Sequence, residues 1–458
     1  MGCDPNVSDR ARKSGAWNMA GSDAQNARIR PFHDHVDGRG GTKGGKREYS
    51  DTMCQECSQN NCFHLRSPQV KVPTLALSSS VLLFLAAPLL AQTSTSILVP
   101  NSSLERPEDR GLRAHTNHLI LLRPDVTGTS PSGETPSSIR AVYKLPSTGG
   151  GGVIAIVDAF HYPTAENDLR VFSSQFKLPA CTKANGCFRQ VFANGTQPQT
   201  NCGWSQEAAL DIEWAHAMAP NAKLVLVEAG SNSFSNLFRA IDVATSAVTT
   251  GGHKGEVSMS WGGGEFSTES SSDGHFQNTG VVYFAASGDT GGSNIYPSTS
   301  PYVVSSGGTS IHRSSNGAFL SESGWSGSGG GPSKYEPKPG YQSGVANTST
   351  IHRSAPDFSF DADPKSGVSV YDSTKCQGLS GWLVFGGTSV SSPSLAGVVN
   401  LAGHFYVNST SELTTIYANR ANSSDFRDIV SGTAGSFSAK TGYDFVTGVG
   451  SDRGTSGK

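Results

Sequence analysis

The chain is poor in charge for its length. Only 16% of its 458 residues are Asp, Glu, Lys or Arg, and the formal net charge at pH 7 is −2. It has no basic stripe, no heptad pattern and no internal repeat. Such a balance gives no electrostatic attraction to nucleic acid or to an anionic membrane, so neither is an expected partner. Hydrophobic residues make up 36%, which is too apolar for a disordered chain and leaves room for one large domain or two ordinary ones.

Long apolar runs are also scarce, and the most prominent one covers residues 75–91. Arg66 and Lys71 precede it and a small residue ends it, which is typical of a secretory signal. Pro88 and three serines make it a poor membrane span, with an anchor or a chance run as the alternative. A start at Met53 would give the run a leader of roughly twenty residues, near the length that a signal has. We expect a secreted protein with no stable membrane association.

This run divides the chain into four parts. Residues 1–70 are polar, glycine-rich and aperiodic, which predicts a disordered extension or a segment absent from the mature protein. Residues 71–92 hold the signal-like run, and residues 93–134 are interpreted as a short linker or pro-segment. In residues 135–458 apolar runs alternate with segments rich in helix formers, so these residues are the expected folded domain.

The expected domain alternates buried strands with helices. Continuous apolar runs at 151–160, 222–230 and 280–288 are bounded by glycine or alanine and predict strands that are buried on both faces. Segments 205–220 and 235–248 are rich in helix formers. This order predicts an α/β fold with a mostly parallel central sheet and helices on both faces, with functional sites at the carboxyl ends of the strands.

The eight cysteines fall into two groups of four. Those after the apolar run can form two disulfides in an exported protein, and the sequence leaves three pairings open; they are Cys181, Cys187, Cys202 and Cys376. The earlier stretch 54–64 has thiols and a histidine at short spacing that could bind zinc, but it lacks a second ligand pair at the usual distance.

Two carboxylates are candidates for acid–base chemistry. Glu207 and Asp211 are spaced i, i+4 on a predicted helix, so they share one face. Close carboxylates raise each other's pKa and tend to share a proton, which suits a general base and its orienting partner. A solvated acidic face is the alternative, but the flanking residues are mostly apolar.

Ser389 is the candidate nucleophile. It follows two glycines and Thr388, and Pro393 is expected inside the first turn of the next helix. The positive end of that helix would help to hold an adjacent oxyanion. Asp289, in a glycine-rich turn after a predicted strand, is either a turn-capping residue or an oxyanion donor. A carboxyl can donate only when protonated, so the second role predicts activity in acid.

His216 is the rival base, although no His-Gly-Thr-His-like signature occurs and packing or capping is the simpler role for it. Near the C-terminus, Asp428 and Asp444 stand among glycines in loops. Hard oxygen ligands from such loops suit calcium, with ordinary loop aspartates as the alternative.

Together these segments resemble the sedolisins, serine-carboxyl peptidases related in fold to subtilisin, over roughly residues 135–450. The motifs that carry the resemblance are Glu-Ala-Ala-Leu-Asp, Ser-Gly-Asp-Thr-Gly-Gly, Gly-Gly-Thr-Ser-Val-Ser-Ser-Pro, Asp-Ile and Gly-Tyr-Asp. The resemblance implies a subtilisin-like fold, catalytic roles and a Ca²⁺ site, with the catalytic residues being Glu207, Asp211, Asp289 and Ser389 and the calcium ligands Asp428, Ile429, Gly442 and Asp444. It also gives supporting places to Asp158 and to Trp261, the latter in Ser-Met-Ser-Trp.

The chain departs from the family in two places. Only a short segment stands where the family carries a long propeptide, and Lys440 replaces a glycine that often serves as a calcium ligand.

The sequence therefore predicts a secreted, monomeric peptidase that cleaves proteins or peptides in acid. Ser389 would attack, Glu207 would be the base, Asp211 would orient it, and Asp289 would bind the oxyanion. One alternative is a subtilisin-type Ser-His-Asp peptidase that uses Asp158 and a histidine. The other is a non-catalytic secreted binding protein on the same fold.

Overall fold

The computed structural model describes residues 95–123 and 128–458. The chain divides into the units Met1–Ala86 and Ala87–Lys458, and the described residues all lie in the second. The expected disordered extension, the signal-like run and the cysteine-rich stretch 54–64 lie outside the described residues. No helix within the described ranges is long and apolar enough to cross a membrane.

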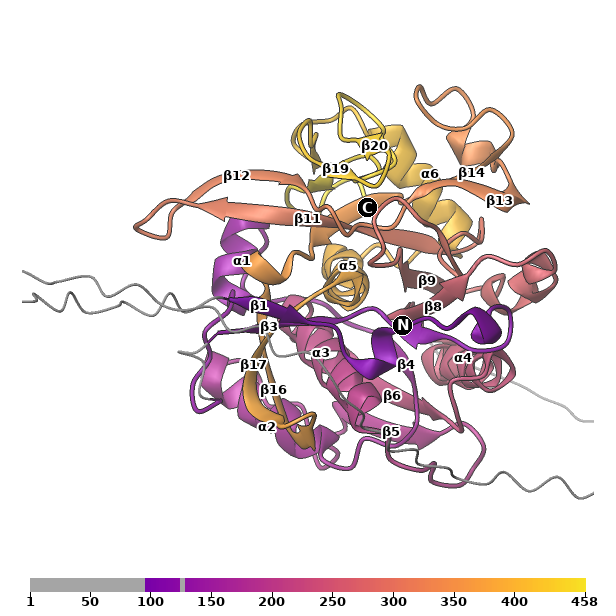
Figure 1. The fold of residues 1–458 in the computed structure, drawn as a ribbon. Coiled ribbons are helices and arrows are strands. Elements are labelled where there is room, and N and C mark those ends of the chain that lie inside the picture. The colour runs from indigo at the N-terminus through magenta and orange to yellow at the C-terminus, as the bar shows by residue number, and fades with distance from the viewer. Residues whose placement is uncertain (1–94, 124–127) are drawn as a thin grey trace, which may run out of the picture. The chain divides into compact units, whose positions relative to one another are not determined.

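A ten-stranded sheet forms the centre of the domain (Figure 1). Its strands are β4 (Val153–Ala159), β5 (Phe188–Phe192), β6 (Lys223–Ala229), β7 (Gly255–Met259), β9 (Val281–Ala286), β11 (Val304–Arg313), β12 (Phe319–Gly324), β15 (Phe358–Asp361), β18 (Phe426–Arg427) and β21 (Ser451–Asp452). The spatial order is β18-β21-β15-β11-β9-β7-β4-β6-β5, with β12 paired to β11. All pairs are parallel except β18–β21 and β11–β12. The mostly parallel sheet confirms the predicted fold class.

Helices cover both faces of this sheet. They are α1 (Pro136–Tyr143), α2 (Ala165–Phe176), α3 (Cys202–Met218), α4 (Phe234–Thr249), α5 (Thr388–Ala402) and α6 (Ser409–Asn419). In β4, alternate side chains serve the two faces: Ile154 and Ile156 pack into the core that contains α3 and α5, whereas Val153 and Val157 pack into the core that contains α4. The helices predicted at 205–220 and 235–248 are thus confirmed as α3 and α4.

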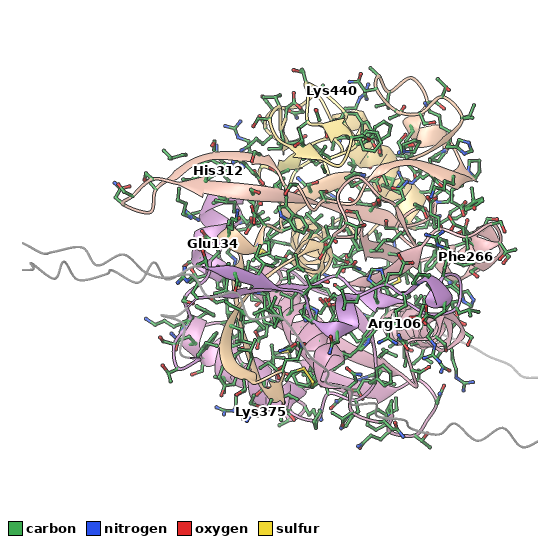
Figure 2. The ribbon with its side chains drawn as sticks, in the orientation of Figure 1. Arg106, Glu134, Phe266, His312, Lys375 and Lys440 are labelled. Atoms are coloured by element: carbon green, nitrogen blue, oxygen red, sulfur yellow. A yellow bond between two sulfur atoms is a disulfide. The ribbon has the colours of Figure 1, made fainter. Side chains whose placement is uncertain are left out.

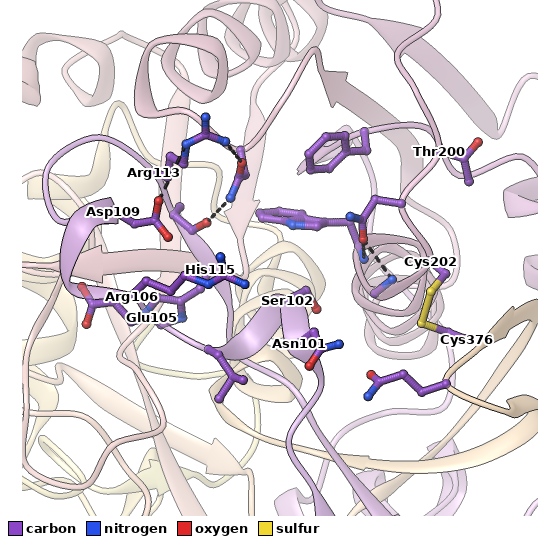
Figure 3. A pocket seen from close by; sticks show the side chains of 18 of the residues that line it. Asn101, Ser102, Glu105, Arg106, Asp109, Arg113, His115, Thr200, Cys202 and Cys376 are labelled. Carbon is purple, nitrogen blue, oxygen red and sulfur yellow. Dashed lines mark hydrogen bonds and ion pairs between the residues drawn. A yellow bond between two sulfur atoms is a disulfide. The ribbon is translucent and has the colours of Figure 1, made fainter. Parts of the chain in front are cut away.

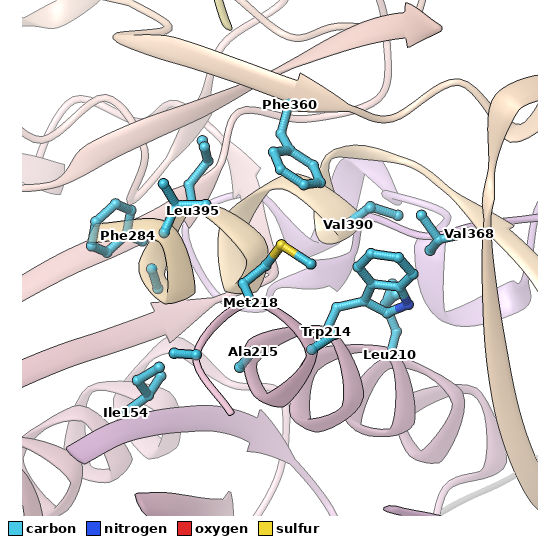
Figure 4. Packing of buried hydrophobic residues seen from close by; sticks show 14 of the residues in the cluster. Ile154, Leu210, Trp214, Ala215, Met218, Phe284, Phe360, Val368, Val390 and Leu395 are labelled. Carbon is cyan, nitrogen blue, oxygen red and sulfur yellow. The ribbon is translucent and has the colours of Figure 1, made fainter. Parts of the chain in front are cut away.

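Helices α3 and α5 pack against each other over one face of the sheet (Figure 4). Leu210 and Trp214 of α3 and Val390 of α5 are fully buried in this contact. The Trp214 indole N–H donates to the carbonyl of Ser369 at 3.0 Å, so this large ring is satisfied inside the core. Because the two helices pack this tightly, residues of α3 have fixed positions relative to the start of α5.

The segment before α1 also belongs to the domain. Strands β1 (Ser96–Leu98) and β3 (Leu119–Leu122) join a sheet with β16 (Val368–Cys376) and β17 (Leu379–Gly386), and β2 (His115–Thr116) joins one with β8 (Trp261–Gly264) and β10 (Ile295–Tyr296). The described part of residues 93–134, expected to be a short linker or pro-segment, therefore contributes strands to sheets of the domain. Two short pairs complete the strands, namely β13 (Gly331–Pro337) with β14 (His352–Ala355) and β19 (Thr433–Ala434) with β20 (Phe437–Ser438).

Candidate active site

Helix α3 carries the two carboxyls that the sequence singles out. Glu207 and Asp211 lie one turn apart on it, and each is 0% exposed. The helix begins firmly because the side chain of Asn201 accepts hydrogen bonds from the amides of Gly203 and Trp204. The two carboxyls are therefore a buried pair and not a solvated acidic face.

A third buried carboxyl joins this pair. Asp158, near the end of β4, has no hydrogen-bond partner for either carboxyl oxygen among the described residues. Burial raises the pKa of Asp158 and of Asp211 well above the usual range, and the charge of Glu207 raises both further. Trp261 donates its indole N–H to the carbonyl of Val157 at 2.7 Å, which holds the ring beside this cluster. Such a cluster retains protons and can exchange them, as a general base must.

Ser260 connects the buried carboxyls to Ser389. Its hydroxyl donates to Asp211 Oδ1 at 2.7 Å, and its carbonyl accepts a hydrogen bond from Ser389 Oγ at 3.1 Å. Ser260 was not predicted as a site residue, although it stands directly before Trp261 in the Ser-Met-Ser-Trp motif. Ser389 is 0% exposed, so in this structure its hydroxyl is closed to solvent.

The start of α5 differs from the expectation in one respect. Pro393 was expected in the first turn, but the helix begins at Thr388, so Pro393 is the sixth residue and lies in the second turn. Proline has no N–H, and this leaves the carbonyl of Ser389, four residues earlier, without its usual helical donor. That carbonyl lies 3.4 Å from Ser260 Oγ. Ser389 itself occupies the second helical position, where the backbone N–H has no partner within the helix.

Asp289 lies against the same helix end. Its Oδ1 accepts hydrogen bonds from both the backbone N–H and the hydroxyl of Thr388, each at 2.8 Å, whereas Oδ2 has no partner among the described residues. Burial raises the pKa of Asp289 to about 8, so the carboxyl is protonated in acid. Since two donors already point at Oδ1, the proton belongs on Oδ2. Asp289 thus has the chemistry of an oxyanion donor.

Two residues that sequence analysis did not consider lie in the centre of this site. His118 Nδ1 is 2.7 Å from Glu207 Oε2, with both side chains 0% exposed. The backbone N–H of Ser389 donates to the carbonyl of Asn117 at 3.0 Å. Both residues come from the segment that was interpreted as a short linker or pro-segment, and no sequence signal pointed to them.

His216 does not serve as the rival base. Its Nε2 lies 2.8 Å from the carbonyl of Pro179, and its ring is near the disulfide of Cys181 and Cys187. Burial lowers the pKa of His216 to about 4, so the ring is neutral over most of the pH range. No histidine within the described ranges hydrogen-bonds to the hydroxyl of Ser389.

Two disulfides form among the described residues, Cys181–Cys187 and Cys202–Cys376. This confirms that the four later cysteines pair with one another. The second disulfide ties the start of α3 to the end of β16. It therefore connects the helix of the carboxyls to the hairpin that leads to Ser389.

A cavity of about 840 Å³ lies beside this disulfide (Figure 3). Ser102 and His115 line it from the N-terminal segment, and Trp204 lines it from α3. The walls therefore include the segment that covers the catalytic candidates, although none of those candidates lines the cavity itself.

The structure brings the calcium candidates onto neighbouring loops. The amide of Gly442 donates to both carboxyl oxygens of Asp428 at 3.1 Å, and the amide of Lys440 donates to Asp444 Oδ2 at 3.1 Å. Figure 2 shows Lys440 in the loops next to β19 and β20. Asp428 is exposed, whereas Asp444 is buried, and burial raises the pKa of Asp444 to about 6. Carboxylate and loop carbonyl oxygens are the hard ligands that calcium takes, so this donor set fits the ion.

Comparisons with known proteins were made by sequence and by structure. No family model matches the chain. The chain is similar to kumamolisin from Bacillus sp. (strain MN-32), with 28% identity over 305 residues, covering 59% of this chain and 52% of kumamolisin. It is similar to sedolisin from Pseudomonas sp. (strain 101), with 33% identity over 172 residues, covering 34% of this chain and 28% of sedolisin. The aligned chain thus spans about half of the first relative and less than a third of the second.

Among solved structures the chain is similar to Pseudomonas sedolisin, a serine-carboxyl proteinase complexed with two molecules of pseudo-iodotyrostatin. The TM-score is 0.59 at 24% identity, over 71% of this chain and 96% of that chain. This likeness establishes that the domain has the fold of that protein.

Proposed function

We propose that this chain, which its sequence and fold make a relative of the sedolisin family, is a serine-carboxyl peptidase that hydrolyses proteins or peptides in acid. The observation that carries the proposal is the linked set at the start of α5. Asp211, Ser260 and Ser389 are joined by hydrogen bonds, and the N–H of Ser389 and the carboxyl of Asp289 lie at the same helix end. A serine linked in this way to a buried carboxyl, with an N–H and a second carboxyl at the same helix end, supports acyl transfer to that serine.

In the proposed reaction Ser389 Oγ attacks the peptide carbonyl and its proton passes to Glu207. The negative charge on the carbonyl oxygen is held by the Ser389 N–H and by the protonated Asp289. Glu207 then gives its proton to the leaving amine. In the second half of the reaction water attacks the acyl group, Glu207 takes the proton of the water and returns it to Ser389 Oγ as the acid product leaves. Asp211 keeps Glu207 in place and shares its proton, supported by its bond from Ser260.

Burial explains why carboxyls rather than a histidine would serve here. The pKa of Asp211 is raised by burial and by neighbouring carboxyls, so its proton stays in the cluster at low pH. A carboxyl base with a proton-sharing partner remains available at a pH where an imidazole would be fully charged. The proposed acid activity follows from this chemistry.

We also propose a calcium ion at the loops of residues 428–429 and 440–444. Asp428 and Asp444 would supply carboxylate oxygens, and Ile429, Lys440 and Gly442 would supply carbonyl oxygens. A bound ion would cross-link the two loops and stabilise this part of the domain.

The proposed protein is secreted and acts as a monomer. Two disulfides in the described part of the chain are typical of an oxidising compartment. All the catalytic candidates come from one chain, so the proposed chemistry needs no second copy.

The decisive experiment is a pH–rate profile on denatured casein for the full chain and two variants, Ser389→Ala and Glu207→Gln. Matched controls are Ser394→Ala, on the same helix with no partner for its hydroxyl among the described residues, and Glu213→Gln, buried on the same helix as Glu207. We expect activity in acid that falls to background in Ser389→Ala and by about 10²–10⁴-fold in Glu207→Gln. Both controls should stay within about threefold of the wild-type chain.

Two outcomes would contradict the proposal. Neutral or alkaline activity that survives Glu207→Gln would favour the Ser-His-Asp alternative. A folded protein without turnover over the whole pH range would favour the binding-protein alternative.

A further inference from the structure

We infer that Glu228, held by His161, is a positioning residue of the proposed reaction, and that this pair sets the pH range in which Glu207 can act as the base. The inference rests on the proposed function and adds two residues to it. Both residues would act through Asp158, the buried carboxyl that lies between them and the carboxyls of α3.

The register of the sheet places Glu228 next to Asp158. The two residues are partners in the parallel pair of β4 and β6. Ile156 and Leu226, two positions earlier in each strand, pack into the core that contains α3 and α5. Because side chains alternate along a strand, Asp158 and Glu228 lie side by side on the face that α3 covers. Neighbouring strands are about 5 Å apart, so two charged carboxyls at these positions would repel each other strongly.

The two carboxyls have very different partners. Glu228 Oε1 accepts hydrogen bonds from the amide of Tyr162 at 2.9 Å and from Gln190 Nε2 at 2.6 Å. Its Oε2 lies 2.8 Å from His161 Nδ1. Asp158 is 1% exposed and accepts no hydrogen bond among the described residues. Donors stabilise the charged form of a carboxyl, whereas burial without donors favours the neutral form, so Glu228 carries the charge and Asp158 keeps the proton.

The charge of Glu228 reaches the proposed catalytic carboxyls through Asp158. Burial raises the pKa of Asp158, and the charges of Glu207 and Glu228 raise it further. Asp158 is in turn one of the groups that raise the pKa of Asp211, after burial itself. A neutral Asp158 can donate a hydrogen bond to a charged neighbour and does not repel it. The ionised carboxyl of the cluster can then be Glu207, as the proposed reaction requires.

His161 joins this row of carboxyls at the end that water reaches. Its side chain is 11% exposed, whereas that of Glu228 is 1% exposed. Between Asp158 and His161 the chain turns at Phe160, whose φ of +68° is a left-handed conformation that bulky residues rarely adopt. Such a conformation persists only where the surroundings hold it, and here the turn precedes the contact of His161 with Glu228. An imidazole paired with a carboxylate carries a positive charge in acid, and this charge offsets part of the charge of Glu228.

The titratable groups around Asp158 and its neighbours come from several elements. They are Glu207 and Asp211 on α3, Glu228 on β6, His161 after β4, His118 before β3 and Asp289 after β9. Glu228 and His161 can be replaced without removing any of the proposed catalytic groups. They are therefore the two positions at which the inference can be tested.

The test is the pH dependence of kcat on one peptide, from about pH 2 to about pH 7, for the full chain and its variants. Glu228→Gln keeps an acceptor oxygen but loses the negative charge, so the cluster releases its proton more easily. The rising limb of kcat should therefore move down by about one pH unit. His161→Asn keeps a donor but loses the positive charge, so the same limb should move up. The double variant should lie between the two single variants.

Glu256→Gln and His275→Asn are the matched controls. Glu256 is a buried carboxyl on β7, the other neighbour of β4, and has its own hydrogen bond at 2.7 Å. His275 also pairs with a carboxylate, at 2.7 Å. Neither residue is among the groups whose charges act on Asp158 or Asp211. Both controls should keep the rising limb of the wild-type chain.

The outcomes separate this inference from the proposed function. A rising limb at the same pH in the wild-type chain, Glu228→Gln and His161→Asn would overturn the inference and leave the proposed function standing. A lower kcat without a shift of the limb would show a purely structural role and would also overturn it. Should Glu228→Gln fail to fold, as its circular dichroism spectrum would show, the shift in His161→Asn decides alone. A wild-type chain without peptidase activity at any pH would overturn the proposed function and this inference together.

Discussion

Replacing Asp289 tests the oxyanion site more sharply than replacing any other residue. Its Oδ1 receives two hydrogen bonds from Thr388 at 2.8 Å, which leaves the proton on Oδ2, the oxygen on the same side of Gly387 as the Asn117 carbonyl. Asp289→Ala removes this donor. Loss of one oxyanion donor typically lowers kcat by about 10²–10³-fold, or about 3–4 kcal/mol of transition-state stabilisation.

The pH dependence adds a second, independent signature. Burial raises the pKa of Asp289 to about 8, so roughly nine-tenths of the carboxyl is protonated at about pH 7 and only a tenth at about pH 9. The wild-type kcat should therefore have a falling limb near that pKa. In Asp289→Asn the amide can place its N–H₂ where Oδ2 was, and an amide donates at every pH. This variant should keep more activity than Asp289→Ala and should lack the limb.

The assay is kcat and KM on one peptide from about pH 3 to about pH 10 for the three proteins, each with its circular dichroism spectrum as a control for folding. Equal falling limbs in the wild-type chain and in Asp289→Asn would refute the role of this proton. A loss of less than about tenfold in Asp289→Ala would refute the donor itself.

Four other features give predictions that need only standard measurements. Ser260→Ala should lower kcat by about tenfold with little change in KM, because the hydroxyl that donates to Asp211 is lost while the carbonyl that accepts from Ser389 stays. A change in KM alone would contradict this. The protein should be more stable in acid than near neutrality. Burial raises the pKa of Glu412 to about 8, above its value in the unfolded chain, so the folded state holds more protons. The stability present at about pH 4 is therefore lost as the pH rises to about 8. For each extra proton that the folded state holds, the free energy of unfolding falls by about 1.4 kcal/mol for every unit that the pH rises. Urea melts at several pH values would show a flat profile if this is wrong. Replacing both Cys202 and Cys376 by serine should lower the free energy of unfolding by about 3 kcal/mol more than replacing both Cys181 and Cys187, because the closed loops span 174 and 6 residues. Equal melting temperatures of the two double variants would contradict this. A chelator should lower the melting temperature by several degrees in the wild-type chain but not in Asp428→Ala, whereas equal shifts would place the ion elsewhere.

Sequence patterns predicted the elements whose signals are local. The strands expected at 151–160, 222–230 and 280–288 correspond to β4, β6 and β9, and both predicted helices form. Buried parallel strands and apolar helices can be recognised from about ten neighbouring residues, so no tertiary information is needed to predict them. The i, i+4 spacing of Glu207 and Asp211 was sufficient for the same reason.

The rest of the site depends on contacts between distant parts of the chain. His118 and Glu207 are 89 positions apart, and Ser260 and Ser389 are 129 apart. Asn117 and His118 stand directly before a short apolar run and follow no pattern that marks a site. Only the pairing of β2 with β8 and of β3 with β17 brings them to Ser389 and Glu207. The disulfide pairing was open for the same reason, because the path of β16 towards α3 decides it. Pro393 was misplaced by one turn because the first residue of a helix is poorly marked in a glycine–serine run.

The two strand edges beside Ser389 would also restrict which conformation a protein must have for the proposed peptidase to digest it. Both β8 and β17 pair with the chain's own N-terminal segment through main-chain groups in extended conformation, and every residue except proline can provide these groups. A native globular protein has few segments with free main-chain groups over this length, since its own sheets and helices already use them. Such an enzyme would select its targets by their loss of structure more than by their side chains. The low pH at which it is proposed to work also unfolds many other proteins. A single fall in pH would therefore both activate the enzyme and produce unfolded substrates for it.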